Sequence, residues 1–407
     1  MSDQSTPDPL EQPGGRHGGD YAPSVLARFA VWQRAGGVAV PLLTAVLAFL
    51  IGGLVVLGTG KNPLTTYKAV FDGTGLNWLF PWVGGAARTT AAYNLQQTLI
   101  ITTSLILTGL AVAFAFRCGM FNIGGQGQYF AGAYFAVWVG STMAGLPSFL
   151  HVFLAVTIAT LAGAVFAGIA GFLKATVGAH EVISTIMLNW VAYWTGSYLF
   201  GLGGPLQNST QKFVPISNDV LDKAKLPVFW GDPLLQGLDV GFFIALGALV
   251  VYFVVLNRTT LGYQVRAVGF NPEAARYGGI NVPRNYVYAM AISGAFAGLA
   301  GAVDILGWQF RISQNDIPVS TVGFIGIAVA LLGRNTAVGT FFGALLFGAL
   351  LTGTSTRHLN ADIFRPDLAG NLTQIIQGLI VLFVGADILI LTVWNQRKRL
   401  RVRRSAA

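Results

Sequence analysis

Long apolar segments alternate with short polar ones along most of the chain. A helix of about 20 apolar residues is long enough to cross a hydrocarbon core of ~30 Å. Inside a bilayer such a segment must satisfy its own backbone hydrogen bonds, which favours helices. The pattern therefore predicts an all-α polytopic membrane protein with about ten transmembrane helices, at Val38–Leu57, Asn94–Phe116, Tyr129–Val139, His151–Leu173, Ile183–Leu202, Val240–Leu256, Tyr286–Leu306, Ser320–Leu332, Ala337–Leu351 and Leu372–Val393.

Glycine-rich breaks interrupt this pattern in each half of the chain. The first break, RCGMFNIGGQGQ, covers Arg117–Gln128. Irregular backbone at membrane depth is tolerated only inside protein or beside a water-filled cavity, so this break is a candidate permeation element, with a simple cytoplasmic turn as the alternative. The second break is Gly333-Arg334-Asn335, and the short segments beside it are either two spans or one re-entrant pair. The GxxxG pair Gly294 and Gly298 predicts close helix packing.

The polar stretches at its two ends divide the chain into one long apolar domain and two tails. Residues 1–37 are polar and rich in Pro and Gly, which predicts a disordered cytoplasmic tail. The transmembrane domain is predicted over 38–393, and 394–407 is a basic tail. The stretch between the first two apolar segments is expected to be a loop. Two further stretches, 203–239 and 352–371, are expected on the outer side of the membrane.

The longest internal stretch rich in charge is Asn257–Arg284. Within it, Asn271 is suited to cap a helix, Pro272 fits the first helical position, and Glu273 complements the helix dipole. The helix is expected to end at Gly278-Gly279, which can adopt the left-handed conformation. The sequence thus predicts a short helix on a membrane face, either as a docking element or as part of a solvated connection between two spans.

Composition agrees with a membrane protein and sets its orientation. Hydrophobic residues make up 54% of the chain, charged residues 10%, and the mean hydropathy is +0.62. The net charge of +9 comes from Lys and Arg clustered at span ends and at the C-terminus, so nucleic acid is not expected as a partner. Because most of these cations fall on one side, the positive-inside rule places both termini and 257–284 in the cytoplasm. The basic tail anchors the last span or attracts anionic membrane lipid.

Motifs of catalysis are missing from the sequence. The only Gly-Lys pair, Gly60-Lys61, lacks the surrounding residues of a phosphate-binding loop, and no GxSxG or HExxH motif occurs. A single cysteine and four scattered histidines suggest no metal site. We therefore expect no catalytic residue and no cofactor bound by this chain.

Polar residues within apolar segments are candidates for solute contact. Amides can donate and accept hydrogen bonds without burying a charge, which suits a neutral hydroxylated or heterocyclic solute. The alternative for each amide is an interhelical hydrogen bond, and a proton-carrying Asp304 would favour an ion-coupled secondary transporter. The candidate substrate path consists of Asn122, Gln126, Gln128, Asn189, Trp190 and Asp304.

Four motifs in this order resemble bacterial ABC-transporter permeases of the branched-chain amino acid and simple-sugar superfamily. They are FNIGGQGQYFAGAYFA (121–136), HEVISTIMLNW (180–190), GYQVRAVGFNPEAARYGGI (262–280) and GFIGIAVALLGRNTAVGTFFGALLFGAL (323–350). The likeness extends over about 38–393 and is greatest to the larger permease subunit of nucleoside importers.

The resemblance implies a permease of the bacterial inner membrane with several partners. These are a cytoplasmic ATPase that binds ATP and Mg, a second permease subunit in a heterodimer, and an extracytoplasmic protein that delivers the small-molecule solute. The ATPase contact is expected at Arg266, Gly269, Asn271, Pro272, Glu273, Ala275, Arg276 and Glu181. Nucleosides are the expected solute, with simple sugars or branched-chain amino acids as the nearer alternative and ion-coupled transport or a receptor-like role as the more distant ones.

Overall fold

The computed structural model describes residues 44–355 and 366–385, and these are mostly helical. The helices are one over Thr44–Gly58, then α2(Pro63–Thr74), η1(Leu76–Leu79), α3(Gly85–Arg117), α4(Gly125–Thr142), α5(Ser148–Val177), α6(Glu181–Phe200), η2(Asp222–Ala224), η3(Pro233–Leu235), α7(Gly241–Arg258), α8(Thr260–Phe270), α9(Pro272–Tyr277), α10(Val282–Asp304), η4(Ile305–Gln309), α11(Asp316–Val319), α12(Val322–Leu332), α13(Ala337–Gly353) and α14(Pro366–Gly385). Two short antiparallel strands, β1(Val228–Trp230) and β2(Leu238–Asp239), complete them. The helical class predicted from the sequence is confirmed.

Some predicted segments fall on residues that the structure leaves undescribed. The two tails, 1–37 and 394–407, lie outside the described residues. The same holds for the start of the first predicted span, for the end of the last one, and for much of the predicted outer stretch 352–371.

Several helices are suited to cross a bilayer. By length and apolar composition, α3, α5, α7 and α10 with η4 qualify among the described residues. Shorter apolar helices follow at Asp316–Leu332, Ala337–Gly353 and Gly370–Phe383. An 11-residue helix such as α12 rises about 16 Å, roughly half the hydrocarbon thickness. The described residues therefore make a multi-pass membrane protein, but their lengths do not amount to ten full crossings.

The prediction of a loop between the first two spans was wrong. Asn62 caps α2 by accepting a hydrogen bond from the N–H of Leu64 (2.9 Å), Pro63 occupies its first turn, and Gly75 ends it in the left-handed conformation. The helix Thr44–Gly58 and α2 meet at 119°, as a broken span or a re-entrant loop. The Asn-Pro start and Gly end are helix signals, but the polar composition between them masked the helix.

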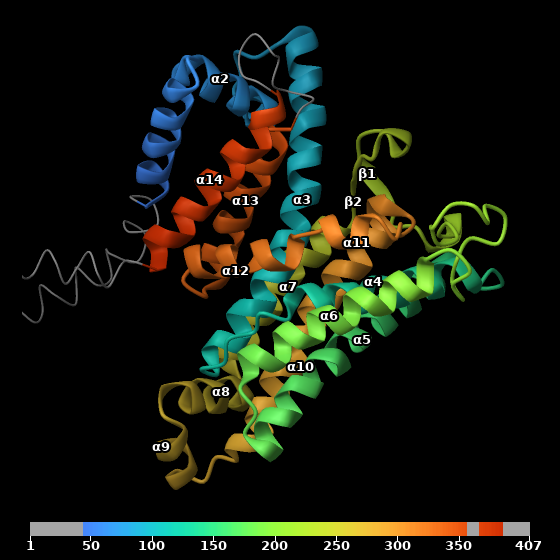
Figure 1. Ribbon diagram of the computed structural model, residues 1–407, viewed down its shortest axis with the longest axis vertical. Coiled ribbons are helices and arrows are strands. Elements are labelled where there is room, and N and C mark those ends of the chain that lie inside the picture. Colours follow the sequence, from blue (N-terminus) through green and yellow to red (C-terminus); the bar gives the residue numbers. More distant parts are fainter. Residues whose placement is uncertain (1–43, 356–365, 386–407) are drawn as a thin grey trace, which may run out of the picture.

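The core is built around α3 and α10, with small residues at the contacts. In an apolar 18-residue stretch of α3, 83% of the residues are buried, and in Figure 1 α3 runs through the middle of the molecule. The most extensive helix–helix interface is the one between α10 and α5. A Cβ atom on Gly294 would lie 2.2 Å from the carbonyl oxygen of Gly163, and one on Gly298 2.6 Å from that of Ala159. The predicted GxxxG packing is confirmed, since only glycine permits this approach of backbones.

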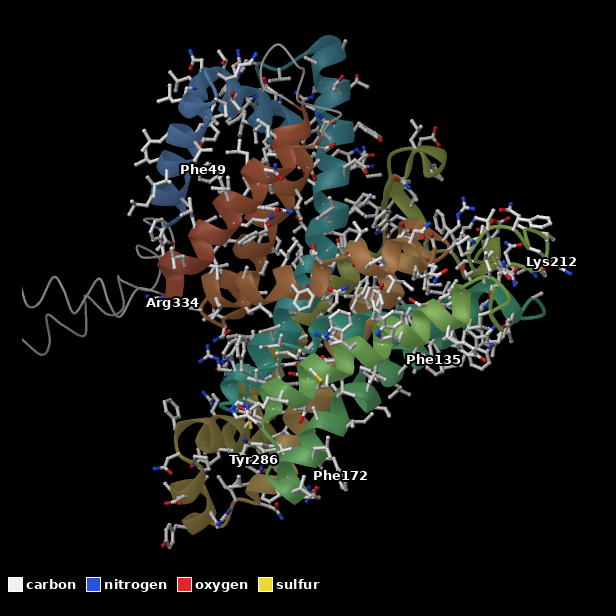
Figure 2. All side chains as sticks on the ribbon, in the orientation of Figure 1. Phe49, Phe135, Phe172, Lys212, Tyr286 and Arg334 are labelled. Atoms are coloured by element: carbon white, nitrogen blue, oxygen red, sulfur yellow. The ribbon has the colours of Figure 1, made fainter. Side chains whose placement is uncertain are left out.

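The polar connections gather at two ends of the helical bundle. Helices α8 and α9 lie at one end, and the long connection containing β1 and β2 lies at the other (Figure 1). Figure 2 shows Tyr286, near the start of α10, close to the α8 and α9 end, and Lys212 at the far tip of the other end. The two predicted extramembranous stretches, 203–239 and 257–284, are thus separated by the apolar helices.

Candidate functional site

A cavity of about 780 Å³ lies near the end that carries the β1–β2 connection. Small-molecule sites typically measure about 300 to 1,000 Å³, so this volume suits a solute of that class. Its walls come from α4, from η4 and the chain that follows it, and from the connection between α6 and α7. The lining residues are Tyr129, Phe130, Ala133, Gln211, Val214, Ile216, Gln236, Ile305, Trp308, Gln309, Arg311, Ile312, Ser313, Asp316, Ile317, Val319, Ser320 and Val322.

Aromatic rings and polar groups share the cavity wall. Tyr129 and Phe130 come from α4, while Trp308 comes from the π-helical turn η4. Gln309 donates from Nε2 to the hydroxyl oxygen of Tyr129 (3.4 Å). Rings of this kind pack against planar or apolar ligand surfaces, and amides fix orientation through hydrogen bonds. The wall can therefore hold a neutral solute that has both a flat face and polar edges.

Asp304 lies behind this wall and positions its aromatic residues. The carboxylate is buried and accepts hydrogen bonds from the Tyr129 hydroxyl (2.7 Å), from Nε1 of Trp308 (3.0 Å) and from the Ser104 hydroxyl. A buried carboxylate needs such donors to offset its lost hydration. Asp304 is absent from the lining, so it acts on the cavity through the two side chains that it holds.

The amides of the glycine-rich break are engaged with each other. Asn122 and Gln128 exchange two hydrogen bonds (2.8 and 2.9 Å), and Nδ2 of Asn122 also donates to the Ser293 hydroxyl (2.7 Å). Oδ1 of Asn122 accepts from the N–H of Gly124 (2.9 Å). The irregular backbone before α4 therefore lies inside protein, as predicted, and these two amides hold it there.

Gln126 and Asn189 join this break to neighbouring helices. Gln126 accepts from the N–H of Gly323 at the start of α12 (2.7 Å). From α6, Asn189 accepts from the N–H of Gly127 (2.8 Å) and donates to the Ile123 carbonyl (3.0 Å). Both amides make interhelical hydrogen bonds, which was the alternative to solute contact.

Of the six residues predicted for the substrate path, none lines the cavity. Trp190 is 55% exposed on the outside of α6. Asp304 and Gln126 contact the wall from behind, since Asp304 accepts from Tyr129 and Trp308 and Gln126 donates to the Ser320 hydroxyl (3.2 Å). Tyr129, Phe130 and Trp308 line the cavity but are not among the residues predicted from the sequence. One signal was present, since Trp308 follows Asp304 by one helical turn, but the π-helical turn that aims it into the cavity is not encoded in a recognisable motif.

At the opposite end, α9 has the ends predicted for it. Oδ1 of Asn271 accepts from the N–H groups of Glu273 (3.0 Å) and Ala274 (3.1 Å). The helix ends with Gly279 at φ +80°, while the N–H of Ile280 bonds to the Ala275 carbonyl (3.0 Å), the pattern of a Schellman motif. Gly278 keeps a right-handed φ of −75°, so only the second of the two glycines is left-handed.

The residues predicted for the ATPase contact differ in exposure. Asn271, Pro272, Glu273 and Arg276 are exposed, whereas Ala275 is buried and Arg266 is half-buried. Phe270 and Tyr277, which flank α9, are 90% and 94% exposed. Large exposed rings beside charged residues are typical of interaction surfaces.

Gly269 and Glu181 face other parts of the same chain. A Cβ atom on Gly269 would lie 2.3 Å from the carbonyl oxygen of Arg117, at the end of α3. Glu181 pairs with Lys174 across the α5–α6 turn (2.8 Å). Gly269 thus joins α8 to the core by direct backbone contact.

The end of α3 also contacts the turn between α12 and α13. Arg117 donates from Nε (3.0 Å) and Nη2 (2.7 Å) to the Asn335 carbonyl, which also accepts from the Tyr252 hydroxyl (2.7 Å). Arg334 and Asn335 have positive φ, which makes this turn tight. One end of the α12–α13 pair is thereby fixed to α3 and α7, and the other end borders the cavity.

Within the described residues, no group of three or more His, Cys, Asp or Glu side chains is placed to hold a metal ion.

Comparisons with known proteins agree with the resemblance seen in the sequence. A family described as "Branched-chain amino acid transport system / permease component" matches residues 94–385. The guanosine ABC transporter permease protein NupP of Bacillus subtilis is 35% identical, over 90% of this chain and 98% of its own length. The nucleoside ABC transporter permease protein NupB of Lactococcus lactis is 33% identical, over 89% and 95%.

A sugar transporter component is also similar. The glucose ABC transporter permease protein TsgB13 of Haloferax volcanii is 34% identical, over 84% of this chain and 86% of its own.

A second guanosine permease protein of Bacillus subtilis, NupQ, is more distantly similar. It is 29% identical, over 62% of this chain and 79% of its own length. No solved structure matches significantly.

Proposed function

Since the chain belongs to the family of branched-chain amino acid transport system permease components, we propose that it forms the solute path of an ATP-driven nucleoside importer. In such a system the permease is not itself the enzyme, and a separate ATPase subunit binds and hydrolyses ATP with Mg. The other proposed partners are a second permease subunit and an extracytoplasmic binding protein that releases the solute into the path.

The observation that carries the substrate proposal is the mixed wall of the cavity. A nucleoside has a flat heterocyclic base and a hydroxylated ribose. The base would pack against Trp308, Tyr129 or Phe130, and the ribose hydroxyls would bond to polar groups such as Gln309 and Ser313. The names of NupP and NupB, a guanosine and a nucleoside transporter permease, support nucleosides as the class of solute. The name of TsgB13 keeps a simple sugar as the second candidate, although a sugar makes less use of three aromatic rings.

The proposed orientation places the cavity end outside and the α8–α9 end in the cytoplasm, with both termini cytoplasmic. This arrangement follows the distribution of Lys and Arg and puts the cavity where a binding protein delivers its solute. In a bacterium the membrane is the inner one. We also propose that the ten apolar segments make up the membrane domain, with α12 and α13 as a re-entrant pair.

The proposed mechanism is alternating access driven by the ATPase. The ATPase would press on α9 and its exposed flanks, Phe270 and Tyr277. Displacement of α8 would reach the end of α3 through Gly269, and from there the α12–α13 turn through Arg117. Such coupling requires that the ATPase binds the two states of the permease with different free energies.

Uptake measurements test this function. Cells that express the whole operon, with or without this gene, would be given radiolabelled guanosine, adenosine or uridine. We expect uptake to require this gene and ATP, and to continue when the proton gradient alone is collapsed. If unlabelled glucose competes for uptake and unlabelled nucleoside does not, the transported solute would be a sugar. If uptake is lost when only the proton gradient is collapsed, the ATP-driven mechanism would be contradicted.

A further inference from the structure

A second, smaller cavity of about 280 Å³ lies at the end of α7 that adjoins α8, far from the substrate wall. It is bounded by α7, α8 and the start of α13. Its lining residues are Arg117, Tyr252, Phe253, Leu256, Asn257, Arg266, Asn335, Thr336, Ala337 and Val338. The described residues therefore bring two guanidinium groups and no carboxylate to the wall of this cavity.

Neither guanidinium forms an ion pair with a carboxylate in the described part of the chain. Arg117 uses Nε and Nη2 on the Asn335 carbonyl, which leaves Nη1. Arg266 donates only from Nε, to the Gly262 carbonyl (3.3 Å). Two like charges in one cavity repel each other unless an anion lies between them. Their remaining N–H groups are suited to phosphate oxygens.

The start of α13 contributes further donors to the same cavity. This helix has 17 residues, and its cap, Thr336, accepts only from the N–H of Gly339 (3.1 Å). The N–H groups of Ala337 and Val338, which line the cavity, have no intrahelical acceptor. A helix N-terminus favours an anion through these groups and through its dipole. The guanidiniums and the helix end therefore favour the same charge.

The surroundings of this cavity distinguish a lipid phosphate from a free one. Apolar side chains on the outer faces of α7 and α13 continue from its mouth: Phe253 is 49% exposed, Val338 69% and Phe342 61%. Acyl chains would lie along them. In addition, the buried Oδ1 of Asn335 has no hydrogen-bond partner among residues 44–355 and 366–385, and a hydroxyl group would supply the missing donor.

We propose that this cavity binds the headgroup of an anionic phospholipid that carries a hydroxyl, of the phosphatidylglycerol class. The phosphate lies between Arg117 and Arg266 at the start of α13, and the headgroup hydroxyl donates to Asn335. The bound lipid bridges α8 to the α12–α13 turn, the two elements that connect the coupling end to the core. This site is independent of the solute that the protein transports.

Native mass spectrometry of the full-length chain in detergent tests this site. The probes are short-chain phosphatidylglycerol, phosphatidic acid, phosphatidylcholine and inorganic phosphate. We expect phosphatidylglycerol to be retained in preference to phosphatidylcholine. Arg266→Gln should weaken its retention by about tenfold, since it removes a charge-assisted hydrogen bond. The matched control is Arg258→Gln, which removes an exposed arginine outside the cavity and should change nothing.

Two further variants separate binding from folding and identify the headgroup. Val338→Asp places a carboxylate at the mouth, in the first turn of α13 where helices tolerate acids, and should weaken retention. Asn335→Gly keeps the positive φ and removes the amide, so it should abolish the preference for phosphatidylglycerol over phosphatidic acid. Three results would each overturn the proposal. Phosphatidylglycerol is retained no better than phosphatidylcholine, Arg258→Gln and Arg266→Gln lose retention equally, or inorganic phosphate binds and the lipid does not.

Discussion

The two ends of this permease are built by different means. At the end that carries the proposed ATPase contact, hereafter the coupling end, α9 is specified locally, since its cap and its terminating glycine lie within nine residues of each other in the sequence, from Asn271 to Gly279. At the cavity end, Tyr129 and Trp308 are far apart in the sequence and meet only through the buried carboxylate of Asp304. The proposed coupling element α9 therefore follows from its own local sequence, whereas the cavity forms only once the helices have packed.

Gly269→Ala should break the connection between the two ends and have the largest effect. The added Cβ atom would lie 2.3 Å from the backbone carbonyl oxygen of Arg117. Backbone atoms cannot yield as a flexible side chain can, so α8 must move away from α3, at a cost of about 1 to 3 kcal/mol. We expect ATP-dependent uptake to fall to background while the amount of protein in the membrane is maintained.

The matched control for that change is Gly278→Ala. Gly278 has φ −75°, and a Cβ atom there would meet its nearest neighbour at an ordinary 3.4 Å. Uptake by this variant should stay close to that of the wild type. Equal uptake in the two alanine variants would mean that the contact between Gly269 and α3 transmits nothing.

Trp308→Ala should damage the cavity end alone. Stacking of a base on an aromatic ring contributes about 1 to 3 kcal/mol, so nucleoside uptake at low concentration should fall by about tenfold or more. Trp308→Phe keeps a ring but removes the donor to Asp304, and should retain part of the activity. Trp190→Ala, on the outside of α6, serves as the comparison; a larger loss there than at Trp308 would return the substrate path to the residues predicted from the sequence.

The contrast between the ends explains what could be predicted from the sequence. Apolar length predicted the helices, and capping rules predicted α9, because both depend on neighbouring residues. The loop assigned before α3 failed because a short polar helix such as α2 has the composition of a loop. The substrate residues were chosen for being polar inside apolar segments, but Asn122 bonds to Ser293 on α10 and Asn189 on α6 bonds to Gly127 on α4. No local pattern distinguishes these two uses.

Asp304→Asn tests whether the carboxylate positions the aromatic residues of the cavity, and it should reduce uptake less than Trp308→Ala. An amide of the same size cannot accept from Tyr129, Trp308 and Ser104 at once, because one side of it donates. With its oxygen toward Ser104 and Trp308, the amide turns its NH2 group toward Tyr129, whose hydroxyl must then accept instead of donate. Replacing charge-assisted hydrogen bonds by neutral ones costs about 1 kcal/mol, which predicts a loss of uptake of about fivefold. The remaining uptake should still depend on ATP and not on the proton gradient. A change of ion dependence in this variant would instead indicate that Asp304 carries a coupling proton.

Asn271→Ala should have the smallest effect, because it alters the coupling end without breaking its contact with the core. The variant loses the hydrogen bonds from Glu273 and Ala274, and a lost cap costs a helix about 1 kcal/mol. Since α9 is short and exposed, its first turn should fray, and the fraction of permeases that present a formed helix to the ATPase should fall. We expect a few-fold loss of uptake and of nucleoside-stimulated ATP hydrolysis, with unchanged insertion and unchanged solute affinity.

Two further variants separate the formation of α9 from its charge. Asn271→Asp can still cap the helix and should restore both uptake and ATP hydrolysis, whereas Arg276→Glu keeps the helix but reverses a charge on its surface. If Asn271→Ala and Arg276→Glu both transport as well as the wild type, then neither the formation of α9 nor its charge matters to the ATPase, and the surface that contacts the ATPase must lie elsewhere on the permease.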